Sequence, residues 1–171
     1  MSVKQFSASY SAYEDRILLS MNTTEKTIFH FLLTRACCQA LLAQIDQVVG
    51  EHLMVEHSLR TSQIIGELQK EGLKKQLNFL EAFEGGDQAP LGEGPILVTQ
   101  THIEMHNEQA LVALTLVNLQ LVRFGLNTLQ LQALALLLER LAHQAKWALN
   151  YVGLPAIVDT AERAIGAQQL H

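Results

Sequence analysis

The chain has 171 residues, of which 49% are hydrophobic and 17% charged, so it is long enough for one well-packed core and short for two. Its 12 Lys and Arg against 17 Asp and Glu give a formal net charge of −5, which argues against a basic surface for nucleic acid. The N-terminus lacks the apolar core of a signal peptide, and we therefore expect a cytoplasmic protein.

The first 33 residues predict strands. Phe6, Ala8 and Tyr10 alternate with serines, and a richer apolar run follows over residues 16–21. Residues 22–26 are typical of a turn, after which residues 27–33 return as the second arm of a hairpin.

Thr34 is placed to cap a helix that we expect to run from Arg35 to about Leu53. Cys37 and Cys38 are the only cysteines and are adjacent in this helical pattern, where a bond between them would be strained. We interpret them as buried, reduced thiols.

The middle of the chain predicts a second helix over residues 58–83, which is apolar on one side only. Glycines end this helix, and residues 85–95, rich in Gly and Pro, predict a surface loop. A strand is expected over residues 96–106.

Residues 111–126 predict two strands that reverse at Val117-Asn118, with Leu119 counted among their apolar positions. From Asn127, a second candidate cap, the apolar spacing becomes helical. Because residues 133–138 are apolar on every side, we expect this helix to be sandwiched between layers or covered by another subunit. A membrane span is excluded here, because the backbone at 125–127 and several Asn and Gln side chains would lie in the bilayer.

The two strand-to-helix stretches resemble each other. When residues 31–45 are set over residues 124–138, Thr34 aligns with Asn127, and a Gln-Ala-Leu run aligns in both. We predict an internal repeat and an α+β fold, with one or two antiparallel sheets from two strand-strand-strand-helix units and a central helical pair between them. The expected single domain, 1–171, divides into a first meander with helix (1–54), an inserted helix (55–84), a loop (85–95), a second meander with helix (96–150) and a tail (151–171).

The best candidate for site chemistry is the run from His102 to His106. On a strand, His102, Glu104 and His106 share one face, with about 6 to 7 Å between successive members, so the three are candidate metal ligands. The alternative is that they form the solvated side of an amphipathic strand. No cofactor and no catalytic residue is predicted, because the sequence has neither a phosphate-binding loop nor a nucleophile motif.

The runs YSAYEDRILLSMNT and FHFLLTR, within residues 10–42, resemble a small bacterial family of uncharacterised proteins with an EDRILL strand and an LTR helix start. The segment PLGEGPILVT, residues 90–99, extends the resemblance. It implies a bacterial source and a stand-alone domain, and it carries no activity or site residues.

These observations favour a non-enzymatic protein–protein interaction or assembly module that forms a homodimer or binds a protein partner. The alternative hypothesis is a small-molecule or metal-binding protein that uses His102, Glu104 and His106. A third alternative is an enzyme whose site is assembled from distant segments, for which the sequence suggests no reaction.

Overall fold

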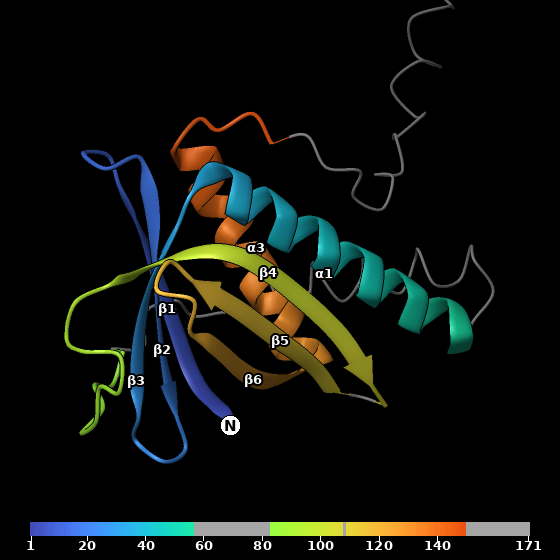
Figure 1. Ribbon diagram of the computed structural model, residues 1–171. Coiled ribbons are helices and arrows are strands. Elements are labelled where there is room, and N and C mark those ends of the chain that lie inside the picture. Colours follow the sequence, from blue (N-terminus) through green and yellow to red (C-terminus); the bar gives the residue numbers. More distant parts are fainter. Residues whose placement is uncertain (57–82, 108, 150–171) are drawn as a thin grey trace, which may run out of the picture.

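A computed structural model describes residues 1–56, 83–107 and 109–149, and in this part of the chain six strands form one mixed sheet beside two helices (Figure 1). The elements are β1 (Val3–Ser11), β2 (Arg16–Thr23), β3 (Ile28–Leu33), α1 (Arg35–Glu56), β4 (Ile96–His106), β5 (Gln109–Leu116), β6 (Leu121–Asn127) and α3 (Thr128–Gln144). The predicted α+β class is confirmed. Neither described helix combines the length and the apolar character needed to cross a membrane.

The strands lie in the sheet in their order along the chain, from β1 to β6. Neighbours pair antiparallel except at the centre, where β3 and β4 run parallel and pair only at Phe31 with Ile96 and at Leu32 with Leu97. The prediction of purely antiparallel sheets is therefore wrong at this junction. A parallel neighbour requires a long crossover, and α1 with the segment after it provides that connection.

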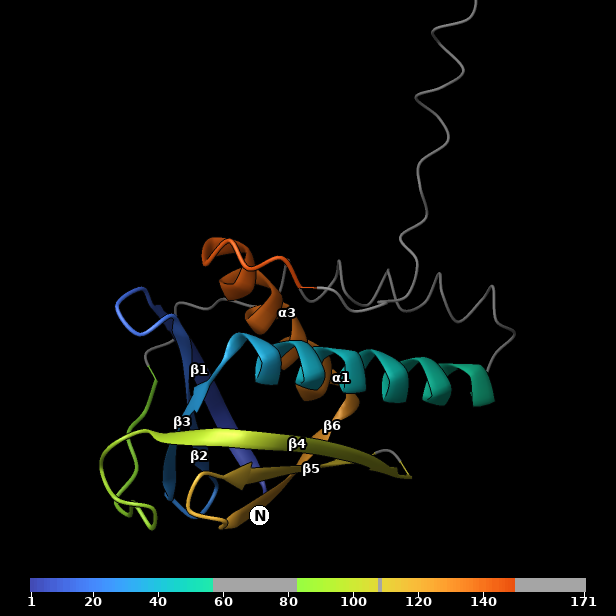
Figure 2. The same ribbon diagram turned by 45° about the horizontal axis from the view of Figure 1, so that its top comes forward.

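The sheet curls until its two outer strands meet at one corner. Ser2 pairs with Gly125 of β6, and the Gly125 N–H donates to the carbonyl of Met1 at 3.0 Å. Figure 2 shows the N-terminus beside one end of β6. This contact brings β1 and β6 together.

The helices supply the apolar layer against this sheet. In Figure 1, α1 runs beside β4 and α3 lies behind β4 and β5, and α3 also contacts β1, β6 and α1.

The predicted period of two holds in β5, where Ala110, Val112, Leu114 and Leu116 are buried and the residues between them are more exposed. The reversal at Val117-Asn118 is confirmed. Leu119 is not an apolar strand position, because it lies in the turn with a φ of 65° and is 86% exposed.

Both helices begin directly after a strand, as predicted. The Thr34 hydroxyl accepts a hydrogen bond from the Cys37 N–H at 3.2 Å, and Asn127 Oδ1 accepts from the Gln130 N–H at 2.8 Å. Gln130 Oε1 accepts in return from the Asn127 N–H at 3.0 Å, which completes a capping box. The two starts thus share one local device, whereas the internal repeat as a true duplication stays a prediction.

The apolar turn of α3 is buried within a single chain, since every residue from Leu131 to Leu138 is buried. Both arrangements expected for this helix, a position between layers and a cover by another subunit, stay predictions, and so does the homodimer. The predicted helix at 58–83 lies outside the described residues except for its last residue, and the inserted segment 55–84 is described only at 55–56 and 83–84. The predicted tail 151–171 also lies outside the described residues.

Candidate functional site, a groove between α1 and β4

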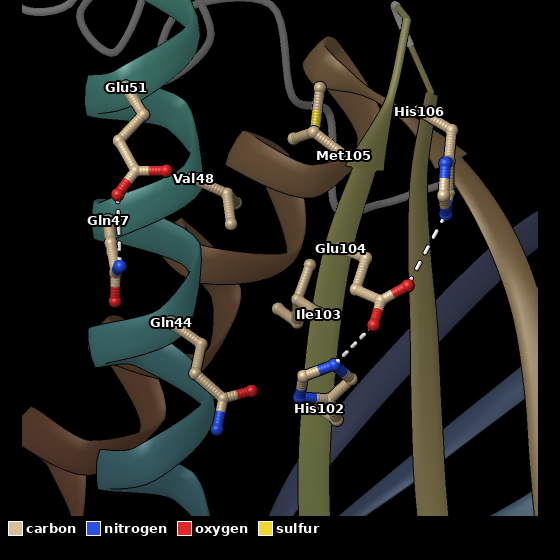
Figure 3. A pocket seen from close by; sticks show the side chains of 9 residues that line it. All are labelled: Gln44, Gln47, Val48, Glu51, His102, Ile103, Glu104, Met105 and His106. Carbon is tan, nitrogen blue, oxygen red and sulfur yellow. Dashed lines mark hydrogen bonds and ion pairs between the residues drawn. The ribbon is translucent and has the colours of Figure 1, made fainter.

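Three polar side chains predicted to share a face of β4 do so. His102, Glu104 and His106 are all more than half exposed, and the Glu104 carboxylate lies between the two imidazoles (Figure 3). Glu104 Oε1 lies 2.8 Å from His102 Nε2, and Oε2 lies 3.3 Å from His106 Nε2. The hydrogen bond with His102, and then that with His106, lowers the pKa of the Glu104 carboxyl from its ordinary value.

These side chains contact one another across the strand surface. Across residues 1–56, 83–107 and 109–149, no group of three or more His, Cys, Asp or Glu side chains is arranged to hold a metal ion. Each oxygen of the Glu104 carboxylate faces a different imidazole of the same strand, as expected for the solvated side of an amphipathic strand. Metal binding by His102, Glu104 and His106 stays a prediction.

A groove adjoins this face, between α1 and β4, with a cavity volume of about 650 Å³. The helix contributes Gln44, Gln47, Val48 and Glu51, which recur every three or four residues and therefore lie on one side of α1 (Figure 3). The strand contributes every residue from His102 to His106. The helical wall was not predicted, although Gln44, Gln47 and Glu51 are polar positions at helical spacing and were a signal for it.

One long edge of β4 faces this groove. On the other side β4 pairs with β5 along its length, but it pairs with β3 only at Ile96 and Leu97, and no other described strand continues that pairing. Gln44 Nε2 donates to the carbonyl of Thr101 at 3.0 Å, which places that carbonyl on the α1 side. Because backbone groups alternate between edges along a strand, those of Ile103 and Met105 point to the same side.

The groove combines an apolar base with hydrogen-bond acceptors. Val48 and Ile103 are buried, whereas Glu51 is exposed and accepts a hydrogen bond from Gln47 Nε2 at 2.9 Å. The exposed Glu51 carboxylate can therefore accept hydrogen bonds from a molecule in the groove.

A second polar cluster lies near the β1–β2 turn and is structural. Asp15 Oδ1 accepts from the Tyr10 hydroxyl and from Trp147 Nε1, both at 2.7 Å, and the two rings meet edge to face at 5.9 Å. These bonds, with that of Tyr10 the larger effect, lower the pKa of the Asp15 carboxyl. Trp147 is buried and joins this cluster to the core.

Comparison of the chain with protein-family models, with curated proteins and with solved structures finds no match. The fold and the groove define the class as an α+β domain with one covered sheet face and a partly unpaired internal strand edge.

Proposed function

We propose that this protein is a non-enzymatic interaction module that binds a polypeptide segment of a protein partner in the groove between α1 and β4. The observation that carries the proposal is the edge of β4 beyond Leu97, which no described strand covers. An edge strand presents a row of backbone donors and acceptors, and an extended peptide can pair with it as an added strand.

The dimensions of the groove suit a short extended segment. Its strand wall runs from His102 to His106, and its helical wall runs from Gln44 to Glu51. These walls are about 10 to 14 Å long at the usual rise per residue of a helix or a strand, which matches about four extended residues. Val48 and Ile103 supply apolar contact, and the backbone of β4 supplies hydrogen bonds.

The titratable groups at the groove also favour recognition over chemistry. Glu51 and the three polar residues of β4 are exposed, so water solvates their side chains. The carboxylate of Glu104 is already engaged by two imidazoles. Such groups can contribute to selectivity at the rim of an interface.

Site-specific photocrosslinking tests the proposal. A photoreactive phenylalanine analogue at Gln47 would sit in the groove, whereas the same residue at Asn118 would sit in the exposed β5–β6 turn. In the native host we expect one partner protein to be captured from position 47 and not from position 118, with the adduct on a short segment of that partner. Equal labelling from both positions, or no adduct from position 47, would contradict the proposal.

The predicted homodimer is a separate outcome of the same experiment. If a second copy occupied the groove, position 47 would yield a crosslinked dimer of this chain, and light scattering at micromolar concentration would give twice the monomer mass. A monomeric mass would rule out that stable dimer while leaving a different protein partner as the occupant.

A further inference from the structure

We infer that the segment bound in the groove is extended and basic, with a Lys or Arg side chain that reaches Glu51. This inference rests on the proposed function and names the chemistry of the partner. It follows from the kinds of polar groups in the groove and from their positions relative to the edge of β4.

The groove offers acceptors and negative charge. None of the nine described residues that line it is Lys or Arg, and its two carboxylates are those of Glu51 and Glu104. The His102 and His106 imidazoles both face Glu104, whereas Glu51 has a neutral amide, that of Gln47, as its hydrogen-bond donor. The whole chain carries a formal net charge of −5. A cationic partner therefore meets a complementary surface.

The hydrogen-bonding groups of the groove indicate the same kind of ligand. The exposed Glu51 carboxylate accepts a hydrogen bond from Gln47 Nε2 and has room for further donors. Lys and Arg side chains are donors, so a basic peptide can supply this carboxylate. A carboxylate-rich peptide has only acceptors to offer from its side chains.

The strand edge sets the pattern of the bound segment. In an added strand, successive side chains point to opposite faces. One set would contact the apolar surface at Val48 and Ile103, and the alternate set would point outward, where it can reach Glu51. The expected segment therefore alternates apolar and basic residues and has no proline where its N–H must pair.

Fluorescence anisotropy with the full chain and synthetic peptides tests this inference. The probe is a fluorescein-labelled nonapeptide of alternating lysine and valine. Matched peptides carry glutamate or serine in place of lysine, or proline in place of the central valine. We expect the lysine peptide to bind, and the glutamate and proline peptides to bind at least about tenfold more weakly. The glutamate peptide is repelled by the carboxylates of the groove, and the proline peptide loses a backbone hydrogen bond to β4.

Charge variants identify the residue responsible. Glu51→Gln should weaken binding of the lysine peptide by about three- to fivefold, the scale of an exposed ion pair, and leave the serine peptide unchanged. Glu93→Gln removes an exposed carboxylate outside the groove lining and should change neither peptide. Raising the salt concentration should reduce the difference between the lysine and serine peptides, because exposed charges are screened. Circular dichroism confirms that the variants are folded.

The outcomes separate the inference from the function on which it rests. If no peptide binds, neither the groove function nor the basic segment stands. If the glutamate or serine peptide binds as tightly as the lysine peptide, the groove binds peptides and the basic specificity is wrong. If the proline peptide binds as tightly, or if Glu93→Gln has the same effect as Glu51→Gln, the proposed pairing with β4 or the role of Glu51 is wrong.

Discussion

Replacing Asn127 with alanine tests how the chain passes from β6 into α3. The Asn127 side chain accepts the Gln130 N–H at 2.8 Å, and alanine leaves that donor without its protein partner. Loss of such a cap costs about 1 kcal/mol, within a range of about 0.5 to 2 kcal/mol. For a chain of this size, each kcal/mol lowers the melting temperature by about 2 to 4 °C. We therefore expect Asn127→Ala to melt about 2 to 4 °C below the wild type.

Thermal unfolding followed by circular dichroism at 222 nm, together with urea unfolding, measures this effect. Asn127→Asp is the matched control, because it keeps an oxygen acceptor at the same position and adds a favourable charge at the helix N-terminus. It should retain wild-type stability. Equal losses in the alanine and aspartate variants would show that the acceptor is not the stabilising group, and a neutral alanine variant would refute the cap itself.

Further predictions concern the two cysteines and the polar side chains of β4. Burial raises the pKa of Cys37 to about 11 and of Cys38 to about 12, so both thiols should resist a thiol reagent at pH 8 until the chain is unfolded. Because the unfolded thiols lose their protons at lower pH, the free energy of unfolding should fall as the pH rises from about 9 towards 11, as circular dichroism can measure. The variant with His102→Ala and His106→Ala should show, by carboxyl NMR titration, a Glu104 pKa that rises towards its ordinary value. If the metal prediction is right, metal analysis of protein prepared without chelator should find zinc, nickel or iron, and His102→Ala should lose that metal. Wild-type protein without any of these metals would contradict the metal prediction.

Much of the fold could be predicted because period-two and helical spacings are local properties of the sequence. The strand expected at residues 96–106 matches β4 from end to end, and the helix starts at Thr34 and Asn127 follow from residue types that accept backbone N–H groups. Leu119 shows the limit of this reasoning. A leucine adds an apolar position to a pattern even where the backbone turns and leaves it in solvent.

The pairing of β3 with β4 could not be predicted, because it joins residues about 65 positions apart through two residue pairs. The candidate site could be predicted only in part, for a similar reason. Strand periodicity places His102, Glu104 and His106 on one face, but it does not determine whether they converge on an ion or bond to one another. It also cannot identify Gln44 and Glu51 as the opposite wall, since that depends on how α1 packs against β4.

The open edge of β4 is a consequence of where β3 ends. β3 stops at Leu33, and α1 begins at Arg35, whereas β4 continues past the last paired residue, Leu97, to His106. Over this distance β4 advances about 30 Å at 3.4 Å per residue, and α1 needs about 20 residues at 1.5 Å per residue to match it, so the helix accompanies the strand along its edge. An α-helix uses its backbone N–H and C=O groups for its own hydrogen bonds, so it cannot pair with a strand edge as another strand does. Helix α1 therefore flanks β4 without satisfying its backbone, and Gln44 bridges the space at one carbonyl. The groove thus arises where α1 replaces β3 as the neighbour of β4. The backbone groups of β4 are the part of the groove that depends least on side-chain identity.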